Sequence, residues 1–256
     1  MKRFIKKHAR AIVISVFIVT LIVTLIYTLI YTLKPSVQIV VSRYNEDLSW
    51  LRVPPFNKYK SIVYNKGVND DFEKHNVQQI INVHNVGRCD HTYLYHIIRN
   101  YSNLAHLTLF LPGSMDIQEK FKQGADIISE MEKSWNTVVI ASRHENVKDD
   151  MYNFKIDTWT ASSKDNSAIN PESNLDTAPI RPFGKWYEDK FGGTVTKHVS
   201  WRGILCIAKP HIIQHSKSHY LNIIRDVDHS SNPEAGHYIE RSWEAIFYPI
   251  DSATIL

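Results

Sequence analysis

The chain has 256 residues, of which 43% are hydrophobic and 22% charged, and its formal net charge is +4. This length is enough for one sizeable α/β domain or two small ones, and no internal repeat or low-complexity tract appears. Five basic residues stand among the first ten, so the remainder is close to neutral. A near-neutral domain argues against a nucleic-acid-binding platform.

The amino terminus joins a basic segment to a long apolar one. Residues 1–10 contain no acid, and residues 11–33 contain no charged residue, Gly or Pro. A helix of that length would span about 34 Å, enough for a hydrocarbon core of roughly 30 Å. Because a cleaved signal peptide has a shorter apolar region followed by a cleavage site, the sequence predicts a transmembrane signal anchor. The positive-inside rule then leaves residues 1–10 in the cytosol and places residues 34–256 in the lumen of the secretory pathway (Golgi or ER), as in a type II membrane protein.

Strands and helices alternate along the rest of the chain. Short apolar runs predict strands, and longer runs with apolar residues at helical spacing predict helices. The alternation predicts an α/β fold with a mainly parallel sheet covered by helices on both faces. The predicted strands are 39–41, 60–64, 79–83, 107–111, 137–141 and 203–208, and the predicted helices are 92–100, 117–135, 219–226 and 233–247.

The segment 144–182 differs from its surroundings. It is polar, rich in Asn, Asp and Ser, and shows little periodicity. This composition predicts a long loop or lid, with a disordered linker as the alternative. A compact aromatic stretch, 182–188, follows it.

Polar side chains follow the first three predicted strands. Because the carboxyl ends of parallel strands lie at one edge of a sheet, we expect these side chains to converge there. Gly87 would let the backbone approach an anion, and Arg88 makes bidentate contacts with phosphate. The alternatives are that Asn45 only caps a helix and that Arg88 forms a surface salt bridge. The candidate residues are Arg43, Asn45 and Glu46 after the first strand, Lys66 after the second, and Gly87, Arg88 and His91 after the third.

A second group of candidates lies on the last predicted helix. The spacing of His237, Glu240 and Arg241 places them on one helix face. A carboxylate held beside a basic group suits a general base that deprotonates a substrate hydroxyl, so Glu240 is the first candidate and Glu234 the second. The alternative is a Glu–Arg pair on a solvated helix face.

The histidines and cysteines do not form a metal-binding pattern. The chain has 13 histidines but no HExxH motif, and its two cysteines, Cys89 and Cys206, have no zinc-site spacing. An oxidising compartment would permit a disulfide between them, which the sequence leaves open.

Several segments together resemble an uncharacterised, glycosyltransferase-like family, catalogued as a domain of unknown function and found in microbial, fungal and large-DNA-virus proteins. The resemblance covers nearly all of residues 37–248. The order of these motifs is also similar to that of family-two-type glycosyltransferases of the GT-A fold. The segments are VVSRYNEDLSWL, IVYNKG, NVGRCDHTYLYHIIRNY, LTLFLPGS, RPFGKWYEDKFG and NPEAGHYIERSWEAIF.

This resemblance implies a GT-A-like domain over residues 34–256. Such a domain would transfer a sugar from a nucleotide-sugar donor to a hydroxyl of a glycan or glycoprotein acceptor. The resemblance implies that Asn45 and Glu46 border the nucleotide and that Glu240 is the catalytic carboxylate. Basic residues that would offset the diphosphate charge are Arg43, Lys66, Arg88, Arg181 and Arg241. Candidates for contact with the sugar or the acceptor are His91, His237, Trp186 and Trp201.

One motif of the GT-A enzymes is missing. Where their Asp-x-Asp metal motif follows a strand, this chain has residues 112–116, and Asp116 is the only acid among them. A lone carboxylate is a poor site for Mn²⁺ or Mg²⁺, so we expect a metal-independent enzyme or a decayed site. The alternative function is a non-catalytic glycan-binding or scaffold protein that uses Trp159, Trp186, Tyr187 and Trp201. A hydrolase ranks last, because there is no GxSxG motif and no zinc spacing.

Overall fold

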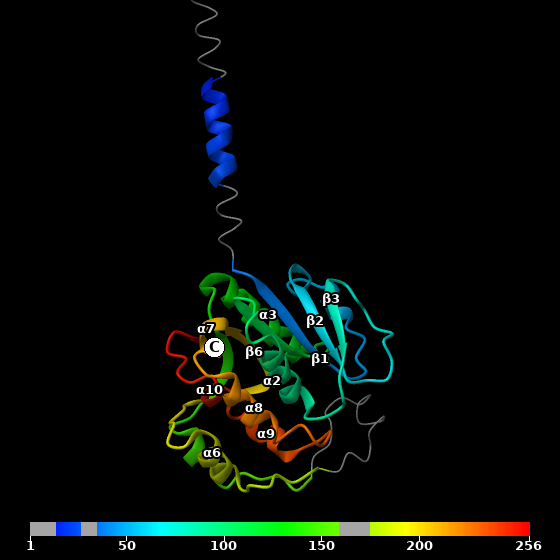
Figure 1. Cartoon of the computed structure of the whole chain (residues 1–256), viewed down its shortest axis with the longest axis vertical. Coiled ribbons are helices and arrows are strands. Elements are labelled where there is room, and N and C mark those ends of the chain that lie inside the picture. Colours follow the sequence, from blue (N-terminus) through cyan, green and yellow to red (C-terminus); the bar gives the residue numbers. More distant parts are fainter. Residues whose placement is uncertain (1–13, 27–34, 159–174) are drawn as a thin grey trace, which may run out of the picture. The chain divides into compact units, whose positions relative to one another are not determined.

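The computed structural model describes residues 14–26, 35–158 and 175–256, and the chain divides into two compact units, Met1–Ser36 and Val37–Leu256 (Figure 1). In the first unit, residues 14–26 are helical and carry exposed apolar side chains. Over the described ranges, none of the helices combines the length and the apolar character that crossing a membrane requires. The basic tail and both ends of the predicted anchor, 11–13 and 27–33, lie outside these ranges, so the anchor stays a prediction.

The second unit is a mixed α/β domain built on one seven-stranded sheet with the order β3-β2-β1-β4-β6-β5-β7. The sheet is mostly parallel, as predicted, but β6 runs antiparallel to both of its neighbours, β4 and β5. The strands are β1 (Val37–Arg43), β2 (Lys60–Asn65), β3 (Val77–Asn82), β4 (Leu107–Pro112), β5 (Val138–Arg143), β6 (His198–Ala208) and β7 (Thr254–Ile255).

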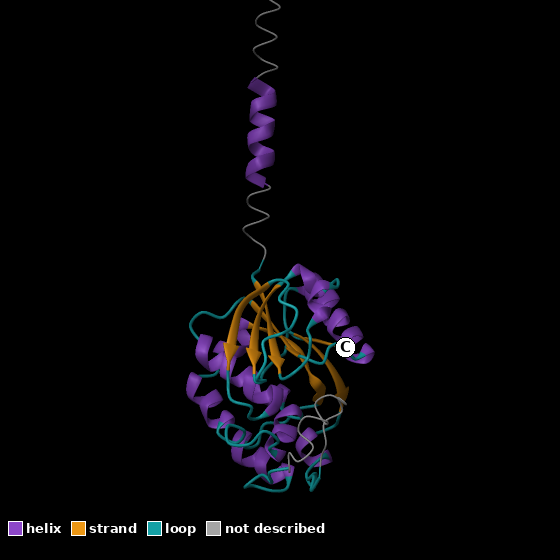
Figure 2. Cartoon of the chain, turned by 90° about the vertical axis from the view of Figure 1, so that its right-hand side faces the viewer, coloured by secondary structure: helices purple, strands orange, loops and turns teal. Residues whose placement is uncertain are grey.

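Helices cover both faces of the sheet, as the alternation predicts (Figure 2). Side chains of β1 alternate between the two faces: Ile39 and Val41 share a core with Met131 of α3, whereas Val40 shares the other core with Tyr93 of α2. The helices are η1 (Ser49–Arg52), η2 (Phe56–Lys58), α2 (Arg88–Asn100), α3 (Gln118–Ser134), α4 (Val147–Asp150), α6 (Phe183–Phe191), α7 (Lys209–Ile213), α8 (Lys217–Ile224), α9 (Glu234–Glu240) and α10 (Trp243–Ile246).

The predicted helix 233–247 is two helices, α9 and α10, which meet at Ser242. The Ser242 hydroxyl donates to the carbonyl of Tyr238 (2.8 Å), and its backbone N–H donates to the carbonyl of Ile239 (2.8 Å). Ser242 therefore leaves the α-helical hydrogen-bond pattern, which hydroxyl side chains that bond to the backbone favour. Within the predicted loop 144–182, the structure shows α4 and describes residues up to 158 and from 175. Residues 159–174 lie outside the described ranges.

The strand order reverses at β1. From β1 the chain steps outward to β2 and then β3, and it returns to place β4 on the other side of β1. In open α/β sheets, ligands bind outside the carboxyl ends of the strands at such a reversal. The loops that follow β1 and β4 therefore frame the place where a ligand is expected.

Candidate functional site

The turn after β1 lies between two glycines. Oε2 of Glu46 accepts hydrogen bonds from the backbone N–H groups of Tyr44 (2.7 Å) and Asn45 (3.1 Å) and so shapes the turn. A Cβ atom on Gly67, after β2, would lie 1.7 Å from the Tyr44 carbonyl oxygen. A Cβ on Gly113, after β4, would meet the Glu46 carboxylate. The loops after three strands thus approach each other more closely than side chains at these glycines would allow.

Arg43 holds these loops together. It is 1% exposed, and its Nε donates to the Glu46 carbonyl (2.7 Å). Its Nη1 donates to Oδ1 of Asn65 (2.6 Å), and its Nη2 donates to Oδ1 of Asn69 (2.7 Å). Its Cζ also lies 4.2 Å from the ring centroid of Phe72. Because protein groups already occupy its donors, Arg43 fits a structural role better than the diphosphate contact that the resemblance implies.

Lys66 fixes the loop that leads into α2. Its Nζ donates to the carbonyl of Val86 (2.5 Å) and also to the carbonyl of Arg88. Gly87 and Arg88 are both left-handed, with φ of 58° and 52°, and a Cβ on Gly87 would lie 2.2 Å from the Val227 carbonyl oxygen. Burial lowers the pKa of Lys66 to about 7. Lys66 therefore positions Arg88.

Two carboxyl groups, those of Asp90 and Glu240, lie where α2 packs against α9, and the charge of Glu240 acts on Asp90. Asp90, in the first turn of α2, is 3% exposed. Burial and then the charge of Glu240 raise the pKa of Asp90 to about 7, against the opposite effect of Arg88. Oε1 of Glu240 accepts a hydrogen bond from the backbone N–H of Arg202 (2.7 Å). Nη1 of Arg88 lies 2.9 Å from Nε2 of His237, so α9 supplies an imidazole to the same cluster.

The two histidines of this region are neutral at physiological pH. Burial, with the charges of Arg88 and Arg241, lowers the pKa of His237 to about 3. Burial and the charge of Lys66 lower the pKa of His91 to about 4. The His91 ring stacks against Tyr95, with ring centroids 5.8 Å apart. These imidazoles are suited to hydrogen bonding rather than to binding an anion by charge.

Arg241 lies at the border of the cluster. Its Cζ is 3.7 Å from the ring centroid of Phe154 and 4.8 Å from that of Trp201. Its Nη1 donates to the carbonyl of His237 (2.8 Å) and lies 3.8 Å from Oε2 of Glu240. Trp201 is therefore half-buried beneath a guanidinium.

Lys120 is a site residue that the sequence analysis missed. It lies in the first turn of α3, directly after the β4 loop, and its Nζ donates to Oγ of Ser114 (2.7 Å). Burial lowers its pKa, and the charges of Glu46, Arg88 and Asp116 also act on it. Asp90 stands among the polar residues after the third predicted strand, but the sequence analysis assigned it no role. Both follow a predicted strand end, which is the signal that could have identified them.

The structure thus gathers one group of charged and polar side chains at the carboxyl edge of the sheet, which we call the edge cluster. Strand-end loops, α2, α3 and α9 supply its members. It consists of Glu46, Lys66, Arg88, Asp90, Lys120, His237 and Glu240.

Glu234, the second predicted base, has a structural place instead. It is fully buried, and its Oε2 lies 2.9 Å from Nε of Arg181. It also accepts hydrogen bonds from the Tyr238 hydroxyl (2.7 Å) and from the backbone N–H groups of Ala178 (2.9 Å) and Ile156 (3.0 Å). Through Ile156 and Ala178, Glu234 connects both described parts of the 144–182 segment to α9. This network also occupies Arg181.

Trp186 does not form an acceptor surface. It is fully buried beside Phe183 and Tyr238, and its Nε1 donates to Oδ2 of Asp226 (2.7 Å). Tyr187 is also fully buried. Aromatic side chains fill the core between α6 and α9, which explains the aromatic stretch in the sequence. Trp159 lies outside the described residues.

The described residues contain no group of three or more His, Cys, Asp or Glu side chains suited to hold a metal ion. Asp116 is exposed. Cys89 and Cys206 are free thiols, so the disulfide that the sequence left open is not formed. Cys89 Sγ lies 3.8 Å from Oδ2 of Asp90, at the edge cluster.

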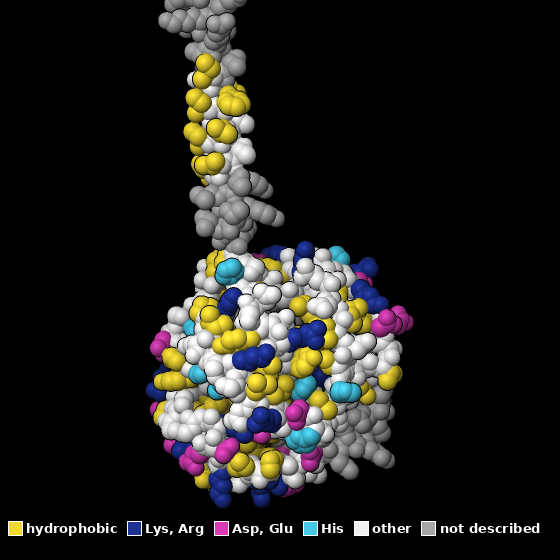
Figure 3. Space-filling model, in the orientation of Figure 1, with side chains coloured by type: hydrophobic (Ala, Val, Ile, Leu, Met, Phe, Trp, Pro, Cys, Tyr) yellow, Lys and Arg dark blue, Asp and Glu magenta, His cyan; other side chains and the backbone are white. Residues whose placement is uncertain are grey.

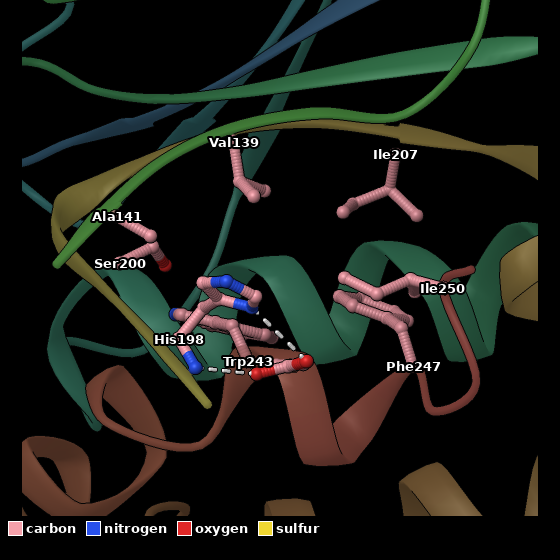
Figure 4. Close-up of a pocket in the computed structure, with 9 residues that line it drawn as sticks. Val139, Ala141, His198, Ser200, Ile207, Trp243, Phe247 and Ile250 are labelled. Carbon is pink, nitrogen blue, oxygen red and sulfur yellow. Dashed lines mark hydrogen bonds and ion pairs between the residues drawn. The ribbon is translucent and has the colours of Figure 1, made fainter. Parts of the chain in front are cut away.

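A small pocket shares no lining residue with the edge cluster (Figure 4). Figure 4 shows Val139 and Ile207 on one side and Phe247 and Ile250 on another, with His198 at the polar end. Nδ1 of His198 lies 3.2 Å from Oε1 of Glu244. With its apolar lining and a His198–Glu244 contact at the polar end, this pocket offers little to a charged nucleotide.

Comparison with protein families identifies the family of the chain. A family model described as a protein of unknown function, DUF3431, matches residues 39–253. The chain therefore belongs to the DUF3431 family. No curated protein matches the sequence.

Proposed function

We propose that this DUF3431 protein is a membrane-anchored glycosyltransferase whose active site is the edge cluster. It moves a sugar from a nucleotide-sugar donor to a hydroxyl of a glycan or glycoprotein. The observation that carries the proposal is the convergence of basic side chains and carboxyl groups at the reversal of the strand order. These groups come from distant parts of the chain, and the charges of several of them affect the pKa of Asp90 and of Lys120.

The donor binds along the loops after β1 and β4. Asn45 and Glu46 border the nucleotide there, as the resemblance implies, and Gly113 lets the β4 loop pack closely against Glu46. Arg88 and Lys120 offset the diphosphate charge, because a guanidinium and an ammonium are the side chains that bind phosphate best. Lys66 contributes by holding the Arg88 loop.

Glu240 is the catalytic base. It removes the proton of the acceptor hydroxyl as that oxygen bonds to the anomeric carbon. The bond from the anomeric carbon to the diphosphate oxygen breaks, and the leaving diphosphate keeps the electron pair. Arg88 and Lys120 stabilise the charge that develops on it.

The donor set does not fit a divalent cation. Mg²⁺ and Mn²⁺ need several oxygen ligands, whereas Asp116 stands alone and exposed at the place of the metal motif. The proposal therefore assigns charge neutralisation to the two basic side chains.

Residues 11–33 anchor the protein, with the catalytic domain in the secretory lumen. Within the described helical part, the hydroxyl of Thr20 donates to the Val16 carbonyl (2.9 Å), and that of Thr24 donates to the Thr20 carbonyl (2.8 Å). Hydroxyls satisfied inside the helix suit an apolar environment. Resistance to alkaline extraction and protection from added protease test the anchor and its orientation.

On the face of the molecule shown in Figure 3, basic and acidic side chains are both spread among uncharged ones, rather than forming one basic surface.

Thermal-shift measurements on the full-length chain test the donor site. UDP, GDP, CMP and their sugars are added with Mn²⁺ or with EDTA. We expect one class to raise the melting temperature, also in EDTA. Lys120→Met should lose this shift, whereas Lys122→Met, two residues along the same helix and 81% exposed, should retain it. No shift with any nucleotide, or equal shifts in both variants, would contradict the proposal.

A further inference from the structure

Asp90 occupies a place for which a structural role gives no explanation. Its Oδ1 is buried and has no hydrogen-bond partner among the described residues. Burying an ionised carboxylate oxygen without a hydrogen bond is costly, whereas the protonated acid loses much less. Such an orphaned group in a native structure calls for an explanation.

Helix α9 passes close to the Asp90 carboxyl group. A Cβ atom on Gly236 would lie 3.5 Å from Oδ2 of Asp90 and 3.9 Å from Cδ of Arg88. Glu240 is four residues beyond Gly236, so both lie on the same face of α9. This geometry brings the Glu240 carboxyl to the Asp90 side of the helix.

We propose that Asp90 holds a proton at neutral pH, so that no second negative charge stands beside Glu240, the proposed base. This inference rests on the proposed function of Glu240 and adds a positioning residue to it. Burial and a negative charge nearby both favour the protonated form of a carboxyl group.

The described groups around Asp90 leave its Oδ1 without a donor, whereas Glu240 has contacts with donors. Oε1 of Glu240 accepts a hydrogen bond from the Arg202 backbone N–H, and Oε2 lies 3.8 Å from Nη1 of Arg241. Asp90 has no such acceptor bonds to Oδ1. The titratable and charged groups that act on Asp90 are Arg88 and Cys89 of α2, Lys66 after β2, and Glu240 of α9, while His237 and Arg241 lie beside Glu240 and Arg88.

The protonation state of Asp90 sets the alkaline limit of the enzyme. When Asp90 loses its proton, a second negative charge appears beside Glu240 and close to the site of the diphosphate. The added charge repels the diphosphate of the donor, so donor binding weakens. We therefore expect activity to fall as the pH rises above neutral.

Infrared titration of the full-length chain, labelled with ¹³C-aspartate, tests the proton directly. We expect a protonated aspartic-acid band at neutral pH, which disappears in Asp90→Asn and remains in the control Asp116→Asn. Glu240→Gln removes the neighbouring charge and should lower the midpoint of this band by about one pH unit. This second variant leaves Asp90 itself intact.

A band that titrates with ordinary carboxyl groups near pH 4, or that persists in Asp90→Asn, overturns the inference. These outcomes do not depend on any donor, so they are distinct from a failure of nucleotide binding, which would overturn the proposed function alone. The pH profile of nucleoside diphosphate release is the second readout. Asp90→Asn, which mimics the protonated acid, should retain activity at alkaline pH where the wild type loses it, and an unchanged alkaline limit would contradict the role.

Discussion

A Cβ atom placed on Gly113 would lie 2.6 Å from Oε2 of Glu46, closer than two such atoms can approach. The same oxygen accepts the backbone N–H groups that shape the turn after β1. The Gly113 carbonyl in turn accepts a hydrogen bond from Nε1 of Trp50 (2.8 Å). The loops after β1 and β4 are therefore fitted to each other at the point where we place the nucleotide.

Gly113→Ala should disturb this fit. The new methyl group forces the Glu46 carboxylate or the β4 loop to move, which costs about 1–3 kcal/mol in the free energy of unfolding. Urea denaturation measures the cost, and thermal shift should show weaker nucleotide binding. Gly193→Ala is the matched control, because a Cβ there would meet nothing within 4 Å. Equal stability of the two variants would mean that the close approach has no energetic consequence.

Shortening Glu46 should restore room for the methyl group. In the double variant Gly113→Ala with Glu46→Ala, the stability loss should be smaller than the sum of the two single losses. A double-mutant cycle measures this coupling. Additive losses would show that the two residues do not constrain each other.

Arg43→Met should destabilise the fold rather than act on the donor alone. The change leaves the Asn65 and Asn69 side-chain oxygens and the Glu46 carbonyl without their donor, at a cost of about 2–5 kcal/mol. Urea denaturation is again the measurement. Arg99→Met, on the exposed side of α2, should change stability by less than about 0.5 kcal/mol. A fully stable Arg43→Met protein that fails to bind nucleotide would return Arg43 to the donor site.

Acid should destabilise the protein through its buried histidines. Burial lowers the pKa of His96 from 6.5 to about 4, and the ring is only 3% exposed. Between pH 6.5 and 4 the unfolded chain binds the proton and the folded protein does not, so stability falls as the pH falls through this window. The shift corresponds to about 3 kcal/mol at 1.36 kcal/mol per pH unit.

His91 and His237 act in the same direction, whereas Asp90 opposes them. Because the pKa of Asp90 is raised from 3.8 to about 7, its contribution to stability is present below pH 3.8 and is lost as the pH rises to about 7. His96→Gln should therefore reduce the loss of stability between pH 6.5 and 4, and Asp90→Asn should enlarge it. Urea denaturation at several pH values measures both. Parallel pH profiles for the wild type and His96→Gln would contradict this assignment.

The sequence predicted the elements whose own composition determines them. The apolar runs around Ile39 and Leu109 could only be buried strands, and the periodicity of residues 117–135 closely matches α3. The antiparallel direction of β6 could not be predicted, because it depends on which strands β6 pairs with, β4 and β5, and these are distant in sequence. The two-residue strand β7 is too short to carry a pattern.

The position of the candidate residues was easier to predict from the sequence than the contacts that each one makes. Strand-end reasoning placed Glu46, Lys66 and Arg88 at one edge, because that argument rests on the geometry of parallel sheets, and Lys66 does contact the Arg88 carbonyl. It could not show that the donors of Arg43 are occupied by neighbouring loops, or that Trp186 is buried. Hydrogen-bond saturation and burial depend on residues far away in the chain.

Release of nucleoside diphosphate from the donor that stabilises the protein tests the central claim most directly. We predict release by the wild type in the presence of EDTA, and its loss by at least about 100-fold in Glu240→Gln, as expected for removal of a general base. Donor binding and thermal stability should be nearly unchanged. Glu244→Gln, whose carboxylate faces His198 and the start of β6, should remain active. Equal release by wild type and Glu240→Gln, or no release with any nucleotide-sugar, would contradict the assignment of the edge cluster as the active site of a glycosyltransferase.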